Sequence, residues 1–365
     1  MAFGSASGYG NLPNGVWSPV IYSKQVQLAF RKSAICEAIT NNDYFGEIAN
    51  MGDSVKIVKE PEVEVKPYLR GTTVAAQDLI DSDFSLNIDK ANYFAFKVDD
   101  IEDAHSHVNF QSLASDRAAY RLADQFDKDV LGYMAGYKQT PAAGATGNIL
   151  EDESADTVNN VINGTKANTA AGGDELLAVN KLKKGDFGNI TTTSAGDHSI
   201  PVAARLSGAT ALPTATVSPA MIVSRMARLL DQQQVDTQGR WLVIDPVMME
   251  ILRDEDSRLL NADFGGSGLQ NGMVLNNFHG FRVYVTSNLP AVGTGAGTSG
   301  SANQNTNYGV ICAGHDSAVA SAEQINKTET YRDPDSFADI VRGMHLYGRK
   351  ILRPEALVSA KYNIA

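Results

Sequence analysis

The stretch NFQSLASDRAAYRLADQFDKDVLGYMAGY, residues 109–137, decides the fold. Its apolar residues recur at steps of three and four, which places them on one face of a helix: Leu113, Ala114, Ala118, Leu122, Phe126, Val130, Met134 and Tyr137. At about 1.5 Å per residue the helix would be roughly 40 Å long, well over twice the usual length in globular proteins. The segment QTPAAGATGN follows and predicts a sharp end. A helix of this length does not close a compact core alone, so we expect a strut that carries other elements.

Composition limits the class of protein. The 365 residues suggest two or more subdomains, and a hydrophobic content of 43% with 20% charged residues is typical of an ordered, folded chain. The net charge of −11 argues against a sequence-reading nucleic-acid binder, which needs a basic footprint, but does not exclude DNA as a neighbour. We find no run that predicts a membrane span and no secretion signal. Cys36 and Cys312 are the only cysteines, and their apolar surroundings predict buried thiols in a reducing compartment.

The region before the long helix predicts an extended arm. Residues 1–15 have little to bury and are expected to be mobile, and a helix is expected from about Lys24 to Thr40. Val55–Lys66 alternates apolar and charged residues, as a strand does, and a second alternating run continues through Phe84–Val98. Together they predict a long two-stranded arm with an irregular tip. Because a lone ribbon is marginal in water, we infer that the arm lies on another copy of the chain.

The region after the long helix divides into an insertion and an α/β unit. Residues 139–216 are rich in Gly, Ala, Thr and Asn, and we interpret them as an insertion on the surface or in a pore-facing loop, with short β-like pieces at 189–193 and 199–205. Regular structure resumes at Ser218, which with Pro219 predicts a helix start. The elements expected after it are a helix at 220–235, a buried strand at 239–246, a helix at 247–257, strands at 278–290 and 308–314, a helix at 315–324, a long β stretch through 340–351 and a final strand at 355–358.

The sequence does not support a catalytic or phosphate-binding motif. Gly295–Gly300 matches the pattern GxGxxG, but the polar stretch SANQNTN follows it where a phosphate-binding site requires a helix. No Ser-His-Asp or Cys-His pairing can be located, and no carboxylate spacing singles out an acid–base pair. We therefore predict no catalytic, metal or cofactor site. The arginines near the C-terminus favour solvated or inter-subunit salt bridges over phosphate binding.

The order of these parts resembles the major capsid protein of tailed bacteriophages, which has the Hong Kong 97-type fold. The resemblance is carried by Gly239–Pro246, by the block from Asn271-Gly272 to Asn288-Leu-Pro290, and by the tail from Tyr331-Arg-Asp-Pro to Arg353-Pro-Glu-Ala-Leu357. It implies an α+β fold with these parts: 1–48 N-terminal arm, 49–98 long β-hairpin E-loop, 99–138 spine helix of the peripheral domain, 139–217 insertion, 218–324 axial domain, and 325–365 returning peripheral-domain strands and C-terminus.

The resemblance also implies a function. The chain would self-assemble as hexamers and pentamers into the icosahedral shell that encloses a phage dsDNA genome, be assembled in the host cytoplasm and be located in the virion capsid. The implied partners are a separate scaffolding protein, a portal, an optional decoration protein, and DNA bound without sequence specificity. No cofactor, catalytic activity or membrane is implied. Candidate subunit contacts are Tyr68, Leu69, Arg70, Arg332, Asp333, Arg342 and Arg349.

The family's precursor shells change the shape of the spine helix on maturation, and two glycines suggest where this chain would bend. Gly132 and Gly136 lie near the end of the predicted helix, and glycine costs about 1 kcal/mol relative to alanine inside a helix. We predict that this end bends in the precursor, with glycines required for close packing as the alternative. Some relatives also crosslink a lysine of the E-loop to a neighbour, but nothing in this sequence identifies a partner for such a bond.

Three alternatives remain open from the sequence. An encapsulin-like nanocompartment shares the fold but encloses enzymes, so particle diameter and contents discriminate it. A shell-decorating or tail protein would bind preformed particles without making its own. An enzyme would have been supported by a phosphate loop or a catalytic cluster, and both of those interpretations failed.

Overall fold

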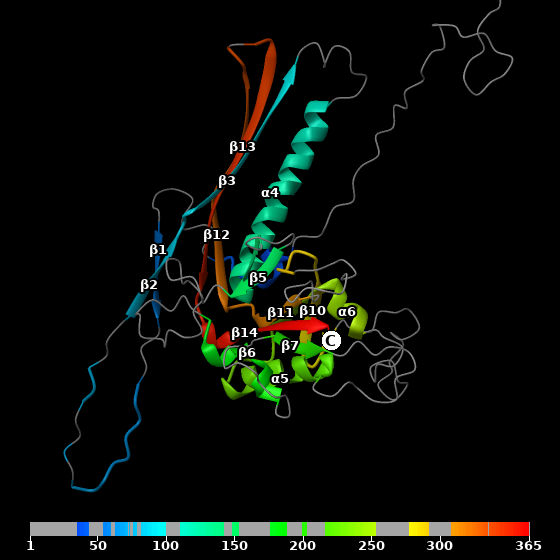
Figure 1. Ribbon diagram of the computed structural model, residues 1–365. Helices are drawn as coiled ribbons and strands as arrows, with labels where there is room; N and C mark the ends of the chain where they lie inside the picture. Colours follow the sequence, from blue (N-terminus) through cyan, green and yellow to red (C-terminus); the bar gives the residue numbers. More distant parts are fainter. Residues whose placement is uncertain are drawn as a thin grey trace, which may run out of the picture.

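The computed structural model describes residues 35–43, 54–59, 63–71, 73, 76–78, 82–99, 110–141, 148–152, 176–187, 199–202, 216–252, 277–291, 308–334 and 336–364. A long helix and a long sheet rise from a mixed α/β unit, and a thin arm projects from their base (Figure 1). Within the part of the chain described, no helix is long and apolar enough to cross a membrane.

The helix that the opening stretch predicts is α4, Phe110–Ala135, with 26 residues. Its burial changes along its length: no side chain described between residues 114 and 123 is fully buried, whereas Phe126, Val130, Leu131 and Met134 are. It ends where Gly136 adopts a left-handed φ of +73° and its amide bonds the carbonyl of Gly132 at 3.0 Å. The helix therefore ends two residues before the expected Tyr137, which begins a strand instead.

A seven-stranded mixed sheet, which we call the central sheet, forms the core of the α/β unit. Its strand order is β6-β14-β11-β8-β10-β9, with β7 also paired to β14. The strands are β6 (Lys181–Leu182), β7 (Ser199–Val202), β8 (Arg240–Ile244), β9 (Asn277–Phe278), β10 (Phe281–Val285), β11 (Tyr308–His315) and β14 (Leu357–Ile364).

Helices cover both faces of the central sheet. On one face α5 (Pro219–Gln232) and α6 (Pro246–Leu252) bury side chains such as Met226 and Met248 against Leu242 and Ile244. On the other face the C-terminal half of α4 and the short α1 (Cys36–Ile39) pack against Trp241 and Val243. The long helix is thus a strut in its upper half and a layer of the core in its lower half.

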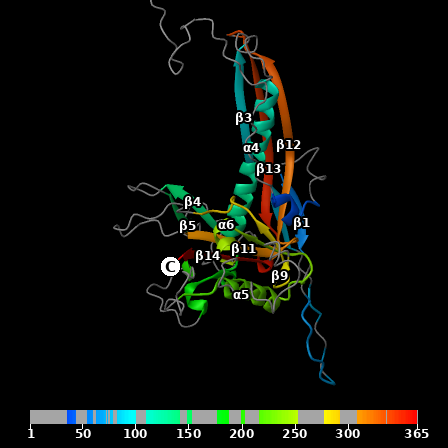
Figure 2. The same ribbon diagram turned by 90° about the vertical axis from the view of Figure 1, so that its right-hand side faces the viewer.

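A second sheet, which we call the long sheet, runs beside the upper half of α4, as two views at right angles show (Figures 1 and 2). Its order is β12-β13-β3, where β12 is Val319–Arg332, β13 is Ala338–Ile351 and β3 is Lys90–Asp99. Side chains alternate between the two faces of a strand. His345 and Tyr347 of β13 contact Phe126 of α4, so Arg342 and Met344 point to the opposite face, where both are exposed.

The arm differs from the sequence expectation at both ends. β1 (Ser54–Lys59) pairs with β2 (Ser82–Asn87), but no strand is present in the described residues of the tip between them. The expected continuation through residues 93–98 leaves the arm, because β3 pairs with β13. We therefore use "arm" for residues 54–87. Of the expected helix at 24–40 only α1 lies within the described residues.

Three further expectations are corrected. The helix expected at 315–324 is instead the end of β11, a turn and the start of β12, since pairing with β13 overrides the helical preference of the alanines in β12. Part of the expected insertion belongs to the core: β6 and β7 pair with β14, and Leu182, Ile200 and Val202 are buried in it. The final strand joins the central sheet, not the long one. The stretch at 189–193, the GxGxxG pattern and the end of the 247–257 helix lie outside the described residues. A short hairpin, β4 (Tyr137–Pro141) with β5 (Asn148–Asp152), completes the fold.

The two helix-end glycines should respond oppositely to alanine. A Cβ on Gly132 would meet only ordinary contacts, 3.6 Å from the carbonyl of Tyr137 and 3.8 Å from Pro290, whereas Gly136 holds a positive φ. We expect Gly132→Ala to raise the free energy of unfolding by up to about 1 kcal/mol and Gly136→Ala to lower it by a similar amount. Urea unfolding of the two variants measures this, and equal shifts of the same sign would contradict it.

Candidate functional site

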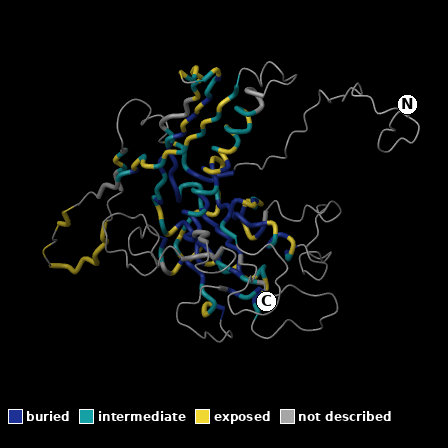
Figure 3. The backbone as a smooth tube through the Cα atoms, turned by 45° about the horizontal axis from the view of Figure 1, so that its top comes forward, coloured by how far each residue is buried: buried dark blue, intermediate teal, exposed yellow. Residues whose placement is uncertain are grey.

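The tip of the arm exposes large apolar side chains. Val63 and Val65 are 64% and 93% exposed, and Tyr68 and Leu69 are 67% and 69% exposed. Arg70 is also exposed and lies in the turn of the tip. Figure 3 shows this segment as a continuous exposed stretch far from the buried core. The structure therefore brings three predicted contact residues together on a surface that its own core does not cover.

The far end of the long sheet presents a second exposed surface. Asp333 accepts from Lys97 Nζ at 2.8 Å and from Ser336 Oγ at 2.6 Å, and this fixes the hairpin between β12 and β13. Arg332 pairs with Asp339 at 3.4 Å. The hairpin displays Phe337, which is 80% exposed and which the sequence analysis did not single out. The sequence signal that could have identified Phe337 is its position directly after the turn-forming stretch DPDS.

Arg342 lies on the exposed face of the long sheet, between the two ends. It pairs with Glu329 of β12 at 2.9 Å and stacks on the ring of Tyr331, with 4.8 Å to the centroid. Tyr93 and Met344, paired in register, extend this face toward the base and are 80% and 41% exposed. The face thus combines apolar side chains with an ion pair that is satisfied within the chain.

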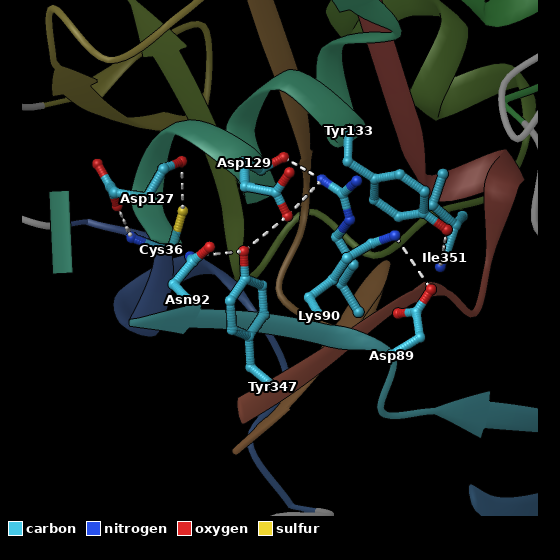
Figure 4. A network of polar contacts seen from close by, with 10 residues as sticks. Cys36, Asp89, Lys90, Asn92, Asp127, Asp129, Tyr133, Tyr347 and Ile351 are labelled. Carbon is cyan, nitrogen blue, oxygen red and sulfur yellow. Dashed lines mark hydrogen bonds and ion pairs between the residues drawn. The ribbon is translucent and has the colours of Figure 1, made fainter. Parts of the chain in front are cut away.

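Arg349, by contrast, makes its contacts within the chain, between β13 and α4. Its guanidinium pairs with Asp129 of α4 at 3.0 Å, contacts the backbone carbonyl of Asp129 and lies over the ring of Tyr133 at 4.4 Å. Tyr347 donates to Asp129 at 3.1 Å (Figure 4), and the hydroxyl of Tyr133 accepts from the amide of Ile351 at 3.3 Å. Only 16% of the Arg349 side chain is exposed, so little of it is available to another subunit.

Asp127 lies at the junction where α1, α4 and the loop after β10 meet, and sequence reasoning missed this residue. It is fully buried. One carboxylate oxygen accepts from the amides of Ile35 at 3.0 Å and Cys36 at 2.9 Å, and the other accepts from the Asn288 amide at 2.8 Å (Figure 4 shows the side toward Cys36). It satisfies amides at the start of α1 that have no partner within that helix. A single side chain of α4 therefore joins α1 and the loop after β10.

Both cysteines are buried and free, as the sequence predicts. Burial, assisted by the neighbouring Asp127, raises the pKa of Cys36, and burial raises the pKa of Cys312 to about 12. Because the thiolate is the reactive form, both side chains act as small apolar groups of the core.

A buried pair holds the last strand to the central sheet. Tyr362 of β14 donates its hydroxyl to the carboxyl of Asp245, with both oxygens 2.6 Å away. Asp245 also accepts from the amide of Met248 at 3.2 Å, as an N-cap of α6 does. Burial raises the pKa of Asp245, although these hydrogen bonds oppose the shift. Burial and the adjacent carboxyl likewise raise the pKa of Tyr362, so the phenol remains a donor.

The described residues thus form a rigid interior with exposed apolar ends, which suits a building block. The family model described as "Phage capsid protein" matches residues 84–360, more than half of the chain. The chain belongs to the phage capsid protein family. The resemblance seen in the sequence is confirmed by this match, which covers α4, the long sheet and all of the central sheet except the second half of β14.

Solved structures similar to this phage capsid protein share its mixed helix-and-sheet fold. A chain from Mycobacterium phage Che8 has a TM-score of 0.63 and 22% identity, and the match covers 95% of this chain and 97% of that one. The capsid structure of Cyanophage P-SCSP1u has a TM-score of 0.61 and 18% identity, and the match covers 96% of this chain and 93% of that one. The capsid of Ralstonia phage GP4 has a TM-score of 0.58 and 13% identity, and the match covers 100% of this chain and 99% of that one. No curated protein matches the sequence.

Removal of the Asp127 carboxylate should loosen the junction. In Asp127→Ala the two amides and the Asn288 side chain lose a buried acceptor, and each such loss costs about 1–3 kcal/mol. We expect the free energy of unfolding to fall by at least about 2 kcal/mol. Asp116→Ala, on the exposed surface of the same helix, is the control and should change it by less than about 0.5 kcal/mol. Urea unfolding measures both, and equal effects would contradict the assignment.

The raised pKa of Asp245 predicts a pH dependence. Because the folded state holds this proton more tightly than the unfolded state, its contribution to stability is full below the ordinary value of 3.8 and is lost as pH rises through the folded pKa. Asp245→Asn keeps an N-cap and an acceptor for Tyr362 but does not titrate.

We therefore expect Asp245→Asn to become progressively more stable relative to the unsubstituted chain as the pH rises from about 3 to about 7. Thermal unfolding across this range tests it. A stability difference that stays constant with pH would show that the carboxyl titrates normally in the fold.

Proposed function

We propose that this chain is the major capsid protein that self-assembles as hexamers and pentamers into the icosahedral shell enclosing a phage dsDNA genome. Membership of the phage capsid protein family supports a shell-forming role. The single observation that carries the assembly proposal is the arm, whose apolar tip is 64–93% exposed at four large side chains. In this role the chain is structural, without catalytic residues or cofactors.

The Hong Kong 97-type parts are assigned as follows. The arm is the E-loop, α4 is the spine helix, α4 with the long sheet is the peripheral domain, and the unit built on the central sheet is the axial domain. Two boundaries move from those expected: β3 belongs to the peripheral domain, since it pairs with β13, and β14 belongs to the axial domain, since it pairs with β11.

The arm crosses a neighbouring subunit. Large contiguous apolar surface on a folded protein marks an interaction site. The exposed face of the long sheet, with Tyr93, Met344 and Tyr331, offers apolar side chains of the same kind on the receiving copy. Because one surface meets a different one, the contact is heterologous, the type that forms rings when the rotation between subunits closes. Phe337 and Arg332, at the far end of the long sheet, meet their mates at local threefold axes.

The remaining partners follow from this role. A separate scaffolding protein guides assembly in the host cytoplasm, and a portal and an optional decoration protein complete the virion. The packaged DNA is bound without sequence specificity, and the net charge of −11 supports an inner wall that repels DNA enough to let it move. Tight binding of an internal DNA fragment with a steep salt dependence would contradict that last point.

The bend of the spine helix remains a prediction. Gly132 lies in the last turn and Gly136 directly after it, next to the fully buried Leu131 and Met134. A bend at this end would therefore move core residues, and a bend above Phe126 would move few. Cryo-EM of precursor shells with residues 132–136 straight would contradict the bend at the glycines.

The proposed function is tested by expressing the chain with and without the scaffolding protein of its phage. Cryo-EM should show closed icosahedral shells of hexamers and pentamers, with DNA rather than enzymes in particles from infected cells. Shells packed with a host enzyme would indicate an encapsulin-like compartment. Chains that bind only to preformed particles would indicate a decorating protein.

The arm tip should be needed for assembly and not for folding. Tyr68→Ser removes an aromatic ring that is 67% exposed, so thermal unfolding of the subunit should be unchanged. Interface aromatics often contribute 2 kcal/mol or more, so the subunit concentration required for assembly should rise roughly 30-fold. Sedimentation measures it, with Glu250→Ser on the exposed side of α6 as the control. Normal assembly of Tyr68→Ser would exclude this side chain from the interface.

A further inference from the structure

The base of the arm lies on a shelf of small residues, which we define as Ala320, Ala322 and Gly348. Both alanines are fully buried, and Gly348 is buried and pairs in register with Ala322. Leu86 of β2 is 0% exposed and packs with the two alanines. Around it are the partly buried apolar side chains Val55, Ile57, Ile88 and Leu352. The arm is therefore seated on its own chain at its base, although its tip is uncovered.

The shelf is on the face of the long sheet opposite α4. Tyr347 and Arg349, the neighbours of Gly348 along β13, both contact residues of α4. Since side chains alternate along a strand, position 348 points the other way. The sheet is thus held between the helix on one face and the arm base on the other, at the level where β12 carries a bulge between Glu323 and Ile325.

Gly348 is the point at which the arm crosses the sheet. A Cβ added there would collide with the carbonyl oxygen of Asn87, and would lie 3.1 Å from both the carbonyl carbon of Asn87 and the Cα of Ile88. These are backbone atoms, so no side-chain rotation can relieve the contact. Any residue other than glycine at this position must therefore lift the chain that leaves the arm.

The connection from β2 to β3, which follows the crossing, is short. Only Ile88 and Asp89 separate β2 from β3, and the first residue of β3, Lys90, is already paired with Tyr347. The chain from Leu69 at the tip to Asn87 can span up to about 60 Å at about 3.3 Å per residue. A tilt of about 10° at the base would then move the tip by roughly 10 Å.

We infer that the shelf and the Gly348 crossing fix the angle of the arm before subunits meet, and that this angle sets the curvature between neighbouring subunits in the shell. Leu86, Ala320, Ala322 and Gly348 are positioning residues: they are buried within their own chain and direct the tip residues toward a neighbour. The second half of the inference rests on the proposed shell function. The first half concerns the single chain and stands apart from it.

The angle of the arm can be measured in the full, unassembled chain. Thr73→Cys at the tip and Ser224→Cys on α5 are both exposed sites for spin labels, and the native cysteines are buried. Double electron–electron resonance should give one narrow distance distribution in this background. Gly348→Ala should shift its mean, and Leu86→Ala should broaden it by emptying the shelf. Gly343→Ala is the matched control on the same strand, because its Cβ would meet the ring of Phe94, a side chain that can turn.

A broad distribution in the background chain, or one that Gly348→Ala leaves unchanged, would overturn the inference. If Gly348→Ala does not fold, Leu86→Ala decides, since an unchanged width would show that the shelf does not hold the arm. Cryo-EM of shells then tests curvature: Gly348→Ala should change the distribution of particle diameters, and Gly343→Ala should not. Unchanged diameters despite a shifted arm would overturn the link to curvature. Absence of any shells from the unsubstituted chain expressed with its scaffolding protein would refute the proposed function while leaving the distance result intact.

Discussion

The structure depends on one buried carboxylate more than on any other polar group. Asp127 binds backbone amides 92 and 91 residues earlier in the chain and an amide side chain 161 residues later. These three donors are neutral: two backbone amides and one side-chain amide. Because leaving such a group unpaired in the core is costly, folding of α1, α4 and the loop after β10 must be coupled. The lower half of α4 becomes a fixed layer of the core, and the upper half can serve as a strut.

The contacts of α4 next to Asp127 extend this rigidity to the long sheet. Asp129, two residues after Asp127, accepts a hydrogen bond from Tyr347 and pairs with Arg349, both of β13. The hydroxyl of Tyr133 accepts from the amide of Ile351. Phe126, His345 and Tyr347 form an aromatic cluster at the same level, with centroids 4.9–5.5 Å apart. The central sheet, the long sheet and the helix therefore meet at one well-packed level. A bend of α4 at Gly132 therefore has to move packed core residues on either side of it, Leu131 and Tyr133 among them.

The sequence predicted those parts whose signal is local. The period of α4 and the apolar run of β8 each lie within one stretch, and both elements formed close to where they were expected. The parts that were wrong depend on distant partners. β6 and β7 have only two and four residues, and they are strands because β14, more than 150 residues later, pairs with both. Ala320 and Ala322 prefer a helix locally, but they are strand residues because β12 pairs with β13.

The candidate site shows the same division. Exposed residues of the arm tip could be proposed from the family resemblance, since exposure follows from a ribbon with nothing beneath it. Asp127 could not, because an aspartate among the charged residues of a long helix looks like any solvated side chain until the segment that covers it is placed. The role of Gly348 could not be predicted either. A glycine in a strand usually indicates a bulge or the close approach of another group, but the sequence does not identify that group. Here the approaching group is the backbone of the arm itself. This makes a residue with no side chain part of how the subunit directs its contact to a neighbour.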